Sequence, residues 1–151
     1  MLRASLNTAL KEAMKARQGR RVSTLRLILA ALKDRDIAAR GEGRPEGLAD
    51  DEILNMLATM IRQRKESIEF YRRGAREDLA AQEEEECAII EGFLPRPLSD
   101  DELLAAAKQI VAELGAKGLK DMGRTMTAFK ARYPGRADFG KAAGVVKELL
   151  S

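Results

Sequence analysis

Hydrophobic residues recur every three or four positions along most of this 151-residue chain, with charged residues between them. This spacing places the apolar side chains on one face of a helix and the charged ones on the other. Leu2, Leu6 and Leu10 begin the first such stripe, and Val145, Val146, Leu149 and Leu150 end the last one. The pattern predicts seven helices, over residues 2–17, 22–39, 50–73, 76–93, 100–114, 121–132 and 139–150.

Glycine and proline separate these segments. Residues 41–49 are rich in glycine and proline and read as a loop. Pro95 and Pro97 end the fourth helix, because proline lacks the N–H and the backbone freedom that a helix interior needs. We therefore expect an all-α fold with a bundle of about four helices over residues 1–94 and a small three-helix domain over residues 98–151.

Polar residues predict where two of the C-terminal helices begin. Ser99 and Glu102 have the spacing of a capping box, in which each side chain accepts a hydrogen bond from the other residue's backbone N–H. Asp138 can cap the last helix in a similar way. The C-terminal domain therefore has well-defined helix starts in its sequence.

Composition narrows the chemistry that the chain can perform. Aromatic residues make up 4% of the chain and tryptophan is absent, so aliphatic residues must fill the core, and a sheet protein is disfavoured. The chain has no histidine, which removes the commonest general base and most zinc sites. Cys87 is the one cysteine, so an internal disulfide is impossible. We expect no catalytic residues, no metal and no cofactor.

Charge is unevenly distributed, although the net charge is only +3. Residues 1–49 hold eleven Lys/Arg against five Asp/Glu, residues 50–94 six against twelve, and residues 95–151 ten against seven. Basic ends attract phosphates and the acidic middle repels them. No apolar run approaches the length of a membrane span and no signal-peptide pattern opens the sequence, so we expect a cytoplasmic protein.

Two polar positions fall on otherwise apolar helix faces. Arg64 lies one turn after Ile61, and Glu86 lies beside Cys87. They could form a catalytic or ligand-binding pair, but we interpret them as an ion pair between two helices, or as side chains whose charged ends extend to solvent, since charged residues are rarely buried without a partner. We interpret Cys87 as a core thiol, because the four glutamates before it would raise the pKa of a nucleophilic cysteine.

The segment from Lys120 to Arg136 is the strongest candidate for a ligand surface. It contains five basic residues and one acidic residue, Asp121. Lysine and arginine beside a helix N-terminus and a glycine turn can contact an RNA backbone. The candidate RNA-binding residues are Lys120, Gly123, Arg124, Lys130, Arg132, Gly135 and Arg136.

Two glycines fall inside the helices predicted here. Gly123 and Gly140 each cost about 1 kcal/mol relative to alanine in a helix interior. Such a cost suggests either a close helix crossing or the approach of a ligand to the backbone. The residues alone leave both explanations open, and with them the choice between an RNA-binding surface and ordinary surface cations over tightly packed helices.

Several separate motifs, in order along nearly the whole chain, resemble the GatB/YqeY family and in particular its free-standing YqeY-like proteins. Two departures are mild: Phe93 stands where tyrosine is usual, and Glu66 where aspartate is frequent. The matching segments include Ile61–Ile68, Gly74–Leu79, Phe93–Pro95, Asp121–Met126 and Gly135–Asp138.

This resemblance implies a helical N-terminal domain and a C-terminal domain similar to the tail of the B subunit of the tRNA-dependent amidotransferase. That tail is understood to help grip tRNA while the chemistry occurs elsewhere in the enzyme. The resemblance thus implies a tRNA-binding accessory protein, with tRNA and a protein of translation as its expected partners. One alternative is a carbon–nitrogen ligase with glutamine as amido donor, or a component of one. Another is a helical protein-interaction module without an RNA role.

Overall fold

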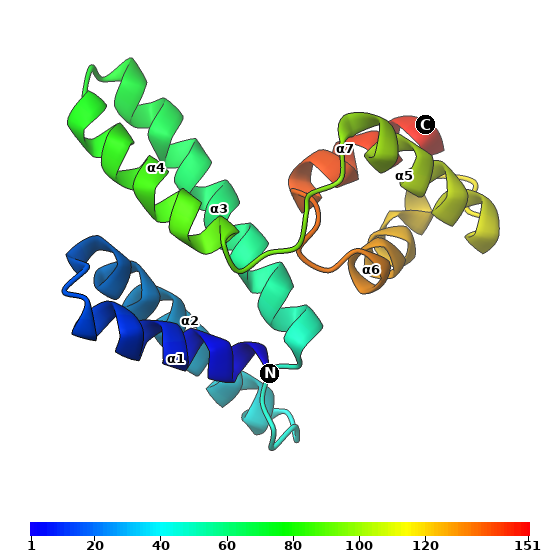
Figure 1. Cartoon of the computed structure of the whole chain (residues 1–151). Helices are drawn as coiled ribbons and strands as arrows, with labels where there is room; N and C mark the ends of the chain where they lie inside the picture. The colour runs from blue at the N-terminus through cyan, green and yellow to red at the C-terminus, as the bar shows by residue number, and fades with distance from the viewer. The chain divides into compact units, whose positions relative to one another are not determined.

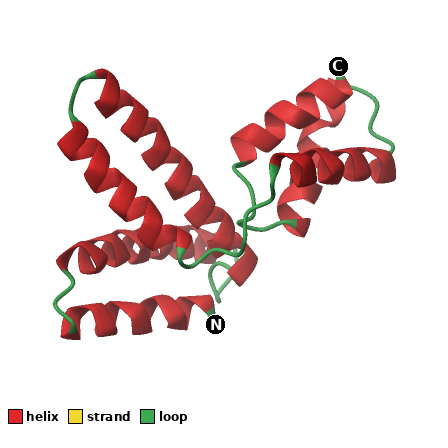
Figure 2. Ribbon diagram, turned by 45° about the horizontal axis from the view of Figure 1, so that its top comes forward, coloured by secondary structure: helices red, strands yellow, loops and turns green.

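The computed structural model describes all residues 1–151 and contains only helices and connecting loops (Figures 1 and 2). The predicted all-α fold is confirmed. The elements are α1 (Leu2–Lys15), α2 (Gly19–Gly41), α3 (Asp50–Arg73), α4 (Glu77–Glu91), α5 (Asp100–Leu114), the 3₁₀ helix η1 (Leu119–Asp121), α6 (Met122–Arg132) and α7 (Phe139–Leu150).

The chain forms two compact units. The N-terminal unit comprises Met1–Phe93 and the C-terminal unit comprises Leu94–Ser151. Each unit has its own hydrophobic core.

The N-terminal unit consists of two helical hairpins, α1–α2 and α3–α4, joined mainly where α4 packs against α2 (Figure 1). The buried apolar residues come from one stripe of each helix, as their spacing predicts. Cys87 belongs to this interior, as we interpreted it. The largest fully buried side chains of this unit are Leu6, Leu25, Ile28, Ile53, Met56, Leu57 and Ile90.

The junction between α1 and α2 differs slightly from the prediction. Helix α1 ends at Lys15 rather than at residue 17, because Arg17 adopts a φ of +55°, which no right-handed helix can include. Helix α2 begins at Gly19, three residues earlier than expected. A glycine in the first turn of a helix lacks the interior cost, so it starts the helix instead of only interrupting the chain.

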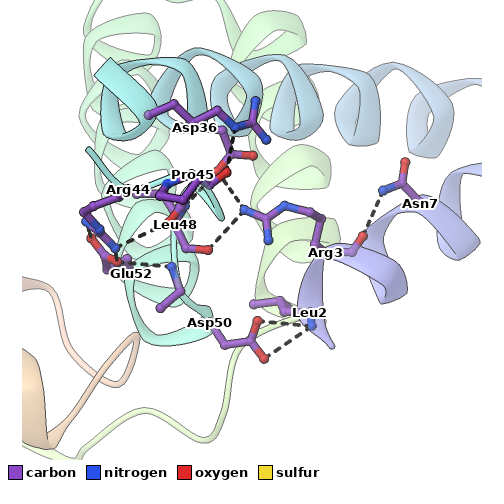
Figure 3. Close-up of polar contacts among 12 residues, drawn as sticks. Leu2, Arg3, Asn7, Asp36, Arg44, Pro45, Leu48, Asp50 and Glu52 are labelled. Carbon is purple, nitrogen blue, oxygen red and sulfur yellow. Dashed lines mark hydrogen bonds and ion pairs between the residues drawn. The ribbon is translucent and has the colours of Figure 1, made fainter. Parts of the chain in front are cut away.

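A buried carboxylate fastens the loop after α2 to both helices of the first hairpin (Figure 3). One oxygen of Asp36 accepts hydrogen bonds from the Arg3 guanidinium at 2.7 Å and from the backbone N–H of Leu48 at 2.8 Å. Arg3 also donates to the Leu48 carbonyl at 3.1 Å. Burial by itself would raise the pKa of Asp36, but the Leu48 N–H and Arg3 together lower it. We call these three residues the Asp36 clasp.

The C-terminal unit packs α5, α6 and α7 around Phe129, which is fully buried. Both predicted helix starts are confirmed. Ser99 and Glu102 form the capping box at α5, and the carboxylate of Asp138 accepts a hydrogen bond from the Gly140 N–H at 2.8 Å at α7. The helices of this unit are therefore fixed by the polar caps as well as by the apolar core.

Candidate nucleic-acid interface

Helix α6 and its two flanking turns carry all seven candidate RNA-binding residues. The inner face of the helix is anchored by Phe129 and by Thr125, whose hydroxyl donates to the Asp121 carbonyl at 2.7 Å. Gly123, Thr127 and Ala131 lie on the opposite face and are exposed. The candidates thus surround one exposed helix face, with Lys120 before it and Gly135 and Arg136 after it.

Two cations, Lys120 and Arg124, lie at the N-terminal end of α6, with Asp121 as the one acidic residue between them. Arg124 Nε lies 3.0 Å from an Asp121 oxygen, and the other Asp121 oxygen accepts the Lys117 N–H at 2.9 Å. The guanidinium of Arg124, followed by the Lys117 N–H, lowers the pKa of Asp121. Lys120 is exposed and forms no ion pair. An exposed pair such as Arg124–Asp121 is weak, so Arg124 can exchange its partner for a phosphate at little cost.

The other two cations of α6 point to different neighbours. Arg132 forms an ion pair with Glu113 of α5, an acid that lies outside the 120–136 segment. Lys130 Nζ lies 5.6 Å from the centre of the Phe139 ring of α7, within the range of a cation–π contact. The surface is therefore less positive than its own sequence indicates, because α5 contributes a carboxylate to it.

Arg136 and Gly135 belong to a structural turn. Arg136 Nε donates to the Arg96 carbonyl at 2.9 Å, and the Arg136 carbonyl accepts the Leu98 N–H at 2.8 Å. Gly135 is buried and has a φ of +69°, a conformation that side chains other than glycine's rarely adopt. The bonds of Arg136 hold the segment before α5 against the α6–α7 turn, and Gly135 gives that turn its shape.

The two helical glycines have different surroundings. A Cβ atom added at Gly123 would meet nothing within 4 Å, so no close helix crossing requires glycine there. Gly123 and Gly140 are each the second residue of their helix, so neither carries the cost of an interior position, and Gly140 also donates its N–H to the Asp138 cap. A close helix crossing is removed as an explanation for Gly123, and the approach of a ligand stays a prediction.

Charge differs between the units. Residues 1–93 hold 17 Lys/Arg and 17 Asp/Glu, while residues 94–151 hold ten and seven, so the net charge of +3 resides in the C-terminal unit. Sequence reasoning overlooked that α5, α7 and the loop before η1 also present exposed lysines. These lysines lie on separate elements of the unit, and Lys141 pairs with Asp100. These additional lysines are Lys108, Lys117, Lys141 and Lys147.

The other polar candidates are structural. Arg64 Nε lies 3.0 Å from Glu86 and 3.9 Å from Glu83, which confirms an ion pair between α3 and α4. Burial raises the pKa of the Cys87 thiol, and nearby Glu91 raises it further, so the thiol is kept protonated. No three histidine, cysteine or carboxylate side chains are grouped so that they could hold a metal ion. None of the helices combines the length and apolar character that a membrane span requires.

Comparison with known proteins finds relatives among yeast proteins named "Altered inheritance of mitochondria protein 41, mitochondrial". The protein of Lachancea thermotolerans is 34% identical over 113 residues, which cover 74% of this chain and 58% of the relative. That of Kluyveromyces lactis is 32% identical over 114 residues, covering 74% and 59%. That of Saccharomyces cerevisiae YJM789 is 32% identical over 93 residues, covering 61% and 48%.

The chain therefore spans less than two thirds of the length of these relatives. Their names place them in mitochondria, and the cytoplasmic location of this chain stays a prediction. The family described as "Yqey-like protein" matches residues 3–150, which is nearly the whole chain. On that match, and in agreement with the motifs noted in the sequence, the chain belongs to the YqeY-like family.

Proposed function

We propose that this protein is an RNA-binding accessory protein whose C-terminal unit contacts the backbone of tRNA through α6. The observation that carries the proposal is the exposed face at the start of α6. There Lys120 and Arg124 flank Gly123, which has no packing role. A bare glycine leaves room for a phosphate to approach this turn of the helix, and the two cations supply charge beside it.

The resemblance of this unit to the amidotransferase tail supports tRNA as the ligand. In this proposal the chain contributes binding, and any chemistry on the tRNA belongs to a partner enzyme. The proposed contacts are to phosphates, which position an RNA without reading its sequence.

The surroundings of the candidate residues other than Gly123 divide them into three groups. Lys120, Arg124 and Lys130 are exposed, and their present partners are absent or weak, so they are the proposed phosphate contacts. Gly135 and Arg136 shape the turn, and their substitution would disturb the fold before it reports on RNA. Arg132 is available only after its ion pair with Glu113 opens.

Filter binding of unmodified tRNA to the full chain tests the proposal. The triple variant Lys120→Gln, Arg124→Gln and Lys130→Gln should weaken binding at least ~10-fold at low salt and reduce the salt dependence by about one phosphate contact per cation removed. A matched triple variant neutralises Lys108, Lys141 and Lys147 on α5 and α7, with the same loss of charge in the same unit. Equal affinity of the two variants for tRNA would refute the α6 site.

A further inference from the structure

The largest excess of positive charge in this protein lies outside the C-terminal unit, on the α1–α2 hairpin. Residues 1–41 contain ten Lys/Arg and three Asp/Glu, whereas residues 50–91, which span the α3–α4 hairpin, contain six and twelve. The net charge of the N-terminal unit is zero because the positive charge of the first hairpin is offset by the negative charge of the rest of the unit. Charge segregated in this way produces a local positive field on one hairpin.

Most of the hairpin's cations lack a partner within the structure. Arg3 pairs with Asp36 and Arg20 with Glu85, while Arg21 lies over the Phe93 ring and Arg40 donates to the Pro45 carbonyl. The remaining six cations form no ion pair. They are Lys11, Lys15, Arg17, Arg26, Lys33 and Arg35, and all are exposed.

Four of the five arginines in residues 50–91 lie beside at least one carboxylate. They are Arg64, Arg72, Arg73 and Arg76. Local compensation is therefore available to this fold, whereas six of the ten cations of the α1–α2 hairpin, those named above, form no ion pair. Uncompensated like charges raise the energy of a free surface, and a polyanion that binds there would lower it.

The cations occupy the solvent faces of regular helices. On α2, Arg26 and Lys33 are seven residues apart, so they share a face at a spacing of about 10 Å, opposite the buried Ile28 and Leu32. On α1, Lys11 and Lys15 are one turn apart and opposite the buried Ala13. Cations held at fixed spacing on a regular helix can contact phosphates of a nucleic-acid backbone.

We propose that the α1–α2 hairpin is a second nucleic-acid surface, which binds the phosphate backbone of double-stranded RNA. Residues 1–41 contain no aromatic residue, so the hairpin has no platform on which unpaired bases could stack. Duplex RNA is recognised largely through its backbone and shape, which suits an array of cations. The choice of RNA over DNA rests on the function proposed above, whereas the charge argument holds without it.

Fluorescence anisotropy with the full chain and a labelled RNA duplex tests this proposal. The hairpin variant carries Lys11→Gln, Lys15→Gln, Arg26→Gln and Lys33→Gln. The matched control carries Lys65→Gln, Arg72→Gln, Arg73→Gln and Arg76→Gln on α3 and in the turn before α4, with the same change in net charge in the same unit. Circular dichroism checks that both variants fold. The hairpin variant should bind the duplex at least ~10-fold more weakly than the control, with a salt slope smaller by up to about four.

Three further arms define the ligand. The parent protein should bind the RNA duplex more tightly than either separated strand and than a DNA duplex of the same sequence, and polyglutamate should compete poorly. Equal binding of duplex RNA by the hairpin variant and its control would overturn the proposal, as would tighter binding of a single strand or of DNA, or efficient competition by polyglutamate. Loss of binding in the hairpin variant, together with parent-like binding by the α6 variant, would refute the α6 site and leave the hairpin surface standing.

Discussion

The Nε atom of Arg136 donates a hydrogen bond to the carbonyl oxygen of Arg96 across 2.9 Å. Forty residues separate the two in the sequence, and a second bond, from the Leu98 N–H to the Arg136 carbonyl, closes the same junction at 2.8 Å. The most C-terminal cation of the candidate RNA segment is therefore a brace within the C-terminal unit. The cations that remain for RNA lie on and before α6.

Replacing Arg136 should alter stability more than RNA affinity. Arg136→Gln removes the bond to the Arg96 carbonyl and should lower the free energy of unfolding by about 1 kcal/mol. Urea unfolding followed by circular dichroism measures this loss, and filter binding of tRNA measures the affinity. A variant of unchanged stability that has lost tRNA binding would show that Arg136 is a direct contact.

Gly47 should tolerate alanine much less well than Gly43, although both have a positive φ. A Cβ atom at Gly47 would lie 2.3 Å from the Asp36 oxygen that Arg3 and Leu48 share, whereas one at Gly43 meets nothing within 4 Å. Gly47→Ala combines backbone strain with a broken Asp36 clasp and should cost about 3 kcal/mol. Gly43→Ala should cost only about 1 kcal/mol, from the strain alone. Similar losses in urea unfolding would argue against the clasp.

Acid should weaken the loop between α2 and α3. Arg44 and the Ala49 N–H lower the pKa of Glu52 from 4.5 to about 2. A carboxylate with a lowered pKa in the folded state stabilises the fold above its unfolded pKa, and this contribution disappears as the pH falls through the folded value. Asp36 adds a change of the same sign, since its pKa is also lowered.

The window for Glu52 thus runs from about pH 4.5 down to about pH 2. Thermal unfolding of the parent and of Glu52→Gln across this range checks the assignment. The difference in melting temperature between the parent and Glu52→Gln should shrink as the pH falls through this window. A difference that stays constant would contradict the pKa shift.

The sequence predicted the helices well because each one obeys local rules. Apolar spacing located all seven α-helices, and Ser99, Glu102 and Asp138 predicted two helix starts that the structure confirms. The Arg64–Glu86 pair was also predictable, because each residue interrupts an apolar stripe and a buried charge requires a partner.

Such local rules do not predict contacts between segments that are distant in the sequence. Asp36 looks like an ordinary surface residue of a helix, and only the fold brings Arg3 and Leu48 to it. In the same way, nothing near Arg132 in the sequence indicates that Glu113 neutralises it. The candidate site was therefore predicted as a segment, and only the structure separates its exposed cations from the residues that brace the turn.

Gly123 offers a test that separates stability from binding. Gly123→Ala meets no neighbour and reduces the conformational entropy of the unfolded chain, so it should stabilise the C-terminal unit by up to about 1 kcal/mol. If a phosphate approaches this turn, the added methyl group should weaken tRNA binding several-fold in the same protein. Thermal unfolding and filter binding of one preparation give both quantities, and a stabilised variant with unchanged affinity would assign Gly123 no role in the ligand site.

Crosslinking of the protein to RNA in cells, followed by sequencing of the bound RNA, tests the central claim most directly. The claim predicts that tRNA dominates the recovered RNA and that the Lys120→Gln, Arg124→Gln, Lys130→Gln variant loses most of it. Its matched variant at Lys108, Lys141 and Lys147 should retain it. Recovery of no RNA above the uncrosslinked background, or of RNA in which tRNA is not enriched, would contradict the claim.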